Sequence, residues 1–236
     1  MEQKTDSPEG GEPKILMENR SWEWAGALLL HAAFFILMLE YHRWRGRNYF
    51  QSLPSFLYVG NKALGIASVL SLSCAIASGP LRRLMGLSAA TVRLRRPLGV
   101  TGALGILPHV LLSLFLLGEK FDWPYYARHW ISAVLGVLAL LGFLWLALIS
   151  WPWALERFGP GKWKAWQQWG YVLVALVFLH AVVSTGKLAN WPEWFGKIGR
   201  PGNPPVPPGS FVTGMAVAAV LVLKAADTIA ARRRRP

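Results

Sequence analysis

Two histidines, each in the middle of a long apolar stretch, are the residues of this sequence best suited to chemistry. His109 lies within residues 98–118, and His180 lies within residues 169–187. An ionisable residue at membrane depth is costly and usually has a function. Because imidazole is a common axial ligand of haem iron, the pair predicts a haem held between two helices.

The spacing of the two histidines supports this prediction. Each lies 11 residues beyond the first residue of its stretch, which at a rise of 1.5 Å per residue is about 16–17 Å into a helix. Two parallel helices would therefore carry them at matching depth. Gly102 and Gly105 share the helical face of His109 and leave room for a flat macrocycle, and Ser184 adds a hydroxyl to the face of His180.

The alternative is that both histidines only pack helices together. A buried histidine can form a hydrogen bond between helices, and faces rich in glycine also serve close helix packing. His31, central in an earlier apolar stretch, is a spare candidate for a ligand or for proton handling. His42 and His129 are expected near the membrane surface, where either could contact an outer substrate or a haem propionate.

Six apolar stretches are long enough to hold these residues within a membrane. Hydrophobic residues make up 53% of the 236-residue chain and charged residues 16%, whereas soluble domains carry about a quarter charged residues. A spanning helix needs about 20 mostly apolar residues, and its backbone groups are satisfied internally. The sequence therefore predicts an all-α integral membrane protein, a six-transmembrane-helix bundle with spans near residues 22–41, 59–78, 98–118, 131–151, 169–187 and 211–231.

The distribution of Lys and Arg predicts the orientation of these spans. The N-terminal tail, the loops near residues 79–97 and 152–168 and the C-terminus together carry 15 of them, and the opposite loops carry 8. Because cytoplasmic loops are enriched in Lys and Arg, both termini are expected in the cytoplasm.

The chain is expected to fold as one membrane domain. Residues 1–20 are predicted to be a disordered cytoplasmic tail, residues 21–231 the six-helix domain and residues 232–236 a basic cytoplasmic tail. Residues 199–210 contain five prolines and are expected to be an extended outer connector. No internal repeat is expected.

Composition also excludes several classes of protein. The single cysteine, Cys74, excludes an internal disulfide, and the absence of a CxxCH motif excludes a covalently attached haem. The formal net charge of +13 is explained by basic cytoplasmic loops. Since the sequence has no motif that recognises the grooves of DNA or RNA, no nucleic-acid partner is expected.

Three stretches resemble the ferric-reductase-like transmembrane domain superfamily. They are an arginine-rich turn at residues 79–87 (GPLRRLMGL), residues 94–114 (LRRPLGVTGALGILPHVLLSL) and residues 163–180 (WKAWQQWGYVLVALVFLH). Within that superfamily the chain is most similar to the haem-binding membrane subunit of the bacterial periplasmic methionine sulfoxide reductase system. The resemblance covers the second to the fifth span.

This resemblance implies a b-type cytochrome of the bacterial inner membrane. His109 and His180 would be the haem ligands, and electrons would pass from a cytoplasmic flavin or quinol donor to an acceptor outside. Many relatives carry another histidine 13 residues before a ligand, where this chain has Arg96 and Gln167, so the resemblance implies one haem b. Basic residues on the inner side, among them Arg96 and Lys164, would hold the phosphate of an FMN or FAD or an anionic donor.

The sequence thus favours an electron-transfer subunit of an oxidoreductase, in contact with membrane lipid and with redox partners. The alternative function is a non-catalytic anchor of a larger complex with other membrane subunits, in which His109 and His180 only pack.

Overall fold

The computed structural model describes residues 21–49, 55–185, 192, 195–198 and 207–234. The tail predicted at residues 1–20 and most of the predicted connector, residues 199–206, lie outside the described residues, as do residues 235–236.

Six helices are long and apolar enough to cross a membrane, which confirms the predicted six-helix architecture. No strand occurs in the described part of the chain. The spans contain α1 (Ser21–Tyr49), α2 (Phe56–Met85), α4 (Arg95–Leu111), α6 (Trp130–Leu148), α8 (Gly170–Thr185) and α10 (Gly209–Arg233).

Further helical segments precede, continue or connect these apolar helices. They are α3 (Ala89–Arg93), the π-helix η2 (Leu112–Leu116), α5 (Trp123–Arg128) and α7 (Pro152–Gln168). The segment of α7 was expected to be a loop, but a proline starts the helix and its polar and tryptophan residues suit a membrane surface. Trp163 fixes α7 to the end of α6, because its Nε1 donates to the carbonyl of Ile149 at 2.8 Å.

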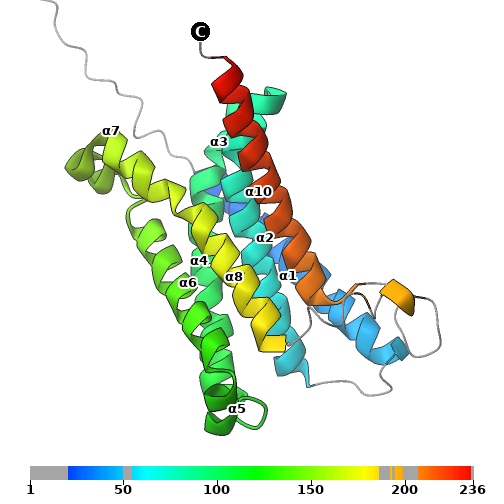
Figure 1. Ribbon diagram of the computed structural model, residues 1–236. Helices are drawn as coiled ribbons and strands as arrows, with labels where there is room; N and C mark the ends of the chain where they lie inside the picture. The colour runs from blue at the N-terminus through cyan, green and yellow to red at the C-terminus, as the bar shows by residue number, and fades with distance from the viewer. Residues whose placement is uncertain (1–20, 50–54, 186–191, 193–194, 199–206, 235–236) are drawn as a thin grey trace, which may run out of the picture.

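The connecting helices mark the two ends of the bundle. Figure 1 shows α3, α7 and the C-terminus at one end and α5 at the other. α2 lies at the centre and packs on α1, α4 and α10, whereas α8 packs mainly on α6.

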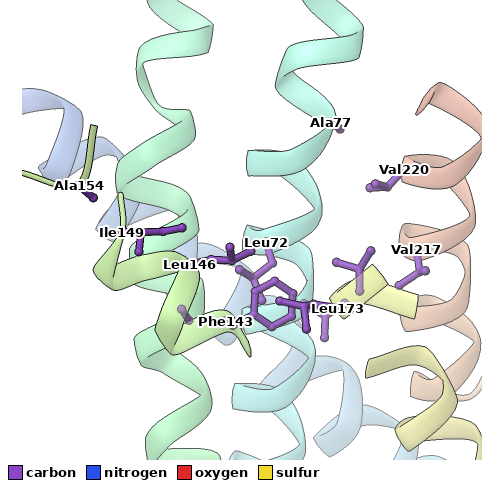
Figure 2. Close-up of a cluster of buried hydrophobic side chains, with 12 residues drawn as sticks. Leu72, Ala77, Phe143, Leu146, Ile149, Ala154, Leu173, Val217 and Val220 are labelled. Carbon is purple, nitrogen blue, oxygen red and sulfur yellow. The ribbon is translucent and has the colours of Figure 1, made fainter. Parts of the chain in front are cut away.

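The main apolar core joins α2, α6, α8 and α10. Figure 2 shows Leu72, Phe143 and Leu173 in contact near its centre, with Val217 and Val220 approaching from α10. Burial of such side chains, and close packing between them, holds the helices in register. The α2 helix also buries polar residues, including Asn61, Ser68 and Ser71.

Candidate functional site

His109 lies against one turn of α2. Its Nδ1 is 2.9 Å from the carbonyl oxygen of Asn61, and its ring covers Gly65, where a Cβ would lie 3.2 Å from the imidazole. The side chain of Asn61 donates to Ser113 Oγ at 2.8 Å, and Ser113 Oγ donates to the carbonyl of His109 at 2.9 Å. Asn61 therefore holds His109 directly and through Ser113.

His180 is held in the same way by α6. Its Nδ1 is 2.8 Å from the carbonyl oxygen of Ser132, and Ser132 Oγ donates to the carbonyl of His180 at 3.1 Å. The ring covers Gly136, where a Cβ would lie 2.9 Å from Nδ1. A side chain at Gly136 would displace the imidazole.

The two arrangements are copies of one pattern. Each histidine follows its carbonyl partner by 48 residues, each covering glycine lies four residues after that partner, and the copies are 71 residues apart. The expectation of no internal repeat is therefore wrong. Few side chains are identical between the two copies, although an offset of 71 residues pairs Gly65 with Gly136 and His109 with His180.

The backbone carbonyls that hold the two histidines were not predicted from the sequence. Asn61 and Ser132 occupy equivalent positions in the two copies, as do Ser113 and Ser184. Ser184, a predicted site residue, lies in the last turn of α8, and its side chain is outside the described part of the structure.

This hydrogen bonding determines which nitrogen of each ring can bind a metal. A carbonyl oxygen only accepts, so Nδ1 of His109 and of His180 carries the proton and Nε2 carries the lone pair. Metal-bound histidines are usually held in this way. The donor set therefore fits bis-histidine ligation.

The predicted glycines Gly102 and Gly105 face α2 and α1. A Cβ at Gly102 would lie 2.9 Å from Leu72 Cγ, and one at Gly105 would lie 2.7 Å from His31 Cε1. Both glycines let α4 approach its neighbours closely. A contact with haem at either position stays a prediction.

The other histidines occupy separate places. His31 lies between α1, α2 and α4, with Nδ1 2.9 Å from Ser71 Oγ. His42 lies beside Gly209 at the start of α10, and His129 lies beside Tyr125, with ring centroids 4.5 Å apart. Among the described residues, no group of three or more His, Cys, Asp or Glu side chains gathers to bind a metal.

The basic residues predicted to bind a flavin or donor lie at the α7 end. The guanidinium of Arg96 is 4.8 Å from the ring centroid of Trp151, and Lys164 is exposed on α7. Gln167 donates to Ser150 Oγ at 3.3 Å.

Residues 64–178 match the family described as "Ferric reductase like transmembrane component". The matched stretch begins in α2, includes Gly65, His109 and Gly136, and ends two residues before His180. This part of the chain is thus similar to a ferric-reductase-like transmembrane component, a family that suggests membrane electron transfer.

Proposed function

From this ferric-reductase-like domain and its two held histidines, we propose that the protein is a transmembrane b-type cytochrome. It relays electrons from a flavin or quinol donor on the cytoplasmic side, through one bis-histidine haem, to an acceptor on the outer side. The observation that carries the proposal is that His109 and His180 each donate Nδ1–H to a backbone carbonyl and keep Nε2 as a donor atom for iron.

The residues of the chain hold and orient the group. When bound, haem supplies an iron that alternates between the ferrous and ferric states and carries one electron at a time. Nε2 of His109 and of His180 would hold this iron. The carbonyls of Asn61 and Ser132 fix the two rings and make the imidazoles stronger electron donors.

The residues at the two positions where many relatives carry a further histidine also agree with a single haem. Arg96 lies over Trp151 and Gln167 bonds to Ser150, so both are engaged in contacts at the α7 end. Neither is a usual haem ligand.

The finer assignments belong to the same proposal. They are a role as the membrane subunit of a methionine sulfoxide reductase system, a place in the bacterial inner membrane, and an FMN or FAD at the α7 end near Arg96 and Lys164. The second candidate function is a non-catalytic anchor, in which the contacts of His109 and His180 only join α4 to α2 and α8 to α6.

A visible spectrum of the purified protein tests the proposal. A low-spin b-type band in the reduced-minus-oxidised spectrum is expected, with one haem per chain in a pyridine haemochrome assay. A colourless preparation would favour the anchor, and two haems per chain would contradict the single site.

Histidine variants test the ligand assignment. His109→Ala and His180→Ala should each lose most haem, and any haem retained should be high-spin because one axial bond is gone. His129→Ala is the control and should keep the low-spin spectrum. If His31→Ala loses haem while His180→Ala keeps it, the assignment of His109 and His180 as the ligand pair is wrong.

A further inference from the structure

Six aromatic rings gather at the end of the bundle opposite α7. This α5 aromatic cluster consists of Tyr58, Phe121, Trp123, Tyr125, Tyr126 and His129. The centroids of rings in contact within the cluster are 4.5–6.3 Å apart. Trp123 is 84% exposed and lies 6.3 Å from Tyr126, so the cluster reaches the surface.

The cluster is joined to His109 by hydrogen bonds. Tyr126 Oη donates to the carbonyl of Ser113 at 3.3 Å, and Ser113 Oγ donates to the carbonyl of His109 at 2.9 Å. Trp123, Tyr126, Ser113 and His109 therefore form a continuous series of contacts from the surface to a proposed ligand.

The protonation state of Tyr126 favours this connection. Burial, with a smaller contribution from Tyr125, raises the pKa of the Tyr126 phenol. The hydroxyl thus stays protonated at neutral pH and can donate to Ser113.

Resting on the proposed function, we propose that Trp123 and Tyr126 form the contact through which single electrons leave the haem for an acceptor at the α5 end. Electrons tunnel more readily through bonds and packed rings than across gaps. The rings serve as the medium and are not themselves oxidised. In each transfer the acceptor would gain the one electron that a haem held by His109 and His180 would supply on oxidation from ferrous to ferric, with no bond broken and no proton moved.

The nearby charges indicate the class of acceptor. Lys62 Nζ lies 4.0 Å from the ring centroid of Tyr58, and Lys120 and Arg128 flank the cluster in sequence. Two acidic residues, Glu119 and Asp122, lie in the same segment, and the side chain of Asp122 accepts from the backbone N–H of Tyr125. The excess of positive charge favours a small anionic oxidant.

Stopped-flow oxidation tests this route. The haem-loaded protein in lipid nanodiscs is reduced and mixed with hexacyanoferrate(III), and the rate is followed at the haem band. Tyr126→Leu and Trp123→Leu should slow oxidation severalfold, and Tyr126→Phe, which removes only the hydrogen bond, should slow it less. None of these substitutions changes the charge that the anion meets.

Two variants serve as matched controls. Trp130→Leu removes an exposed ring at the same end, and Trp153→Leu removes one from α7; both should react at the wild-type rate. If the Tyr126 and Trp123 variants have an intact haem spectrum and react at the wild-type rate, the electron route is wrong and the proposed function is unaffected. Slower oxidation in Trp153→Leu would also contradict the route. A protein without haem would overturn the proposed function and the route with it.

Discussion

At the scale of single residues, the site depends on an imidazole lying on a glycine. The missing Cβ lets the ring approach the helix closely enough to reach the carbonyl four residues earlier, as at Gly65 with Asn61 and at Gly136 with Ser132. Because this contact fixes the ring, the backbone of a second helix determines the direction in which Nε2 of each histidine points. Flexible side chains alone would fix the ring less well.

A methyl group at Gly136 should disturb this contact. The Cβ of Gly136→Ala would lie 2.9 Å from His180 Nδ1, so the ring must move, and such overpacking costs about 1–3 kcal/mol. We expect a lower thermal midpoint of unfolding and weakened haem retention. Both are read from a thermal melt followed at the haem band.

Gly60→Ala is the control for this substitution. Gly60 is also buried in a helix, but a Cβ there meets no atom within 4 Å. It should leave the spectrum unchanged and gain up to about 1 kcal/mol from helix propensity. If Gly136→Ala behaves like Gly60→Ala, the glycine contact does not position His180.

At the scale of elements, the apolar stretches were predictable and the connections between them were not. Length and hydropathy identify a span because lipid requires a helix of a certain length. The helix α7 has mixed polarity and a break at Gly159, where φ is 71°, so its sequence resembles a loop. The π-helix Leu112–Leu116 follows Pro108 and His109, and no simple periodicity marks it.

The candidate site was predictable to the same extent. His109 and His180 are recognisable because an ionisable residue in an apolar stretch stands out. Asn61 and Ser132 bind them through backbone carbonyls, which every residue possesses, so residue type gives little sign of that role. Gly102 and Gly105 were expected to leave room for a macrocycle. The structure shows them packed against Leu72 and His31, which come from distant parts of the sequence.

One ion pair joins the ends of α2 and α10. Arg83 donates from Nε and one terminal nitrogen to both carboxylate oxygens of Asp227, each at 2.7 Å. The Asp227 side chain is only 10% exposed. Because Arg83 is half-exposed and solvent screens the pair, Asp227→Ala should lower the free energy of unfolding by about 1 kcal/mol.

The neighbouring Arg82 provides the control for this ion pair. It is exposed on the same turn of α2, so Arg82→Ala should change the free energy of unfolding by no more than about 0.5 kcal/mol. Thermal unfolding of both variants in detergent measures the difference. Equal effects would show that the Arg83–Asp227 pair contributes no specific stability.

At the scale of the whole molecule, the repeat gives a structural reason to expect the two histidines at one depth. α2 and α4 form one copy, α6 and α8 form the second, and the copies run in the same direction across the bundle. Parallel repeats of this kind are related by an axis along the membrane normal. Equivalent residues of the two copies would then lie at equal depth, so a repeated helix pair would provide the two matched ligands of the proposed haem.

The same arrangement makes the orientation of the protein testable. The C-terminus, α3 and α7 share one end of the bundle, and α5 lies at the other. The distribution of Lys and Arg predicts that the end with α3 and α7 is cytoplasmic, so a reporter fused after Pro236 should be active only in the cytoplasm. A reporter inserted after Gly118, before α5, is the matched control, for which the opposite result is expected: activity only outside. An outside signal at Pro236 with a cytoplasmic signal at Gly118 would reverse the orientation, and with it the direction of electron flow, while leaving the histidine pair and its carbonyl contacts intact.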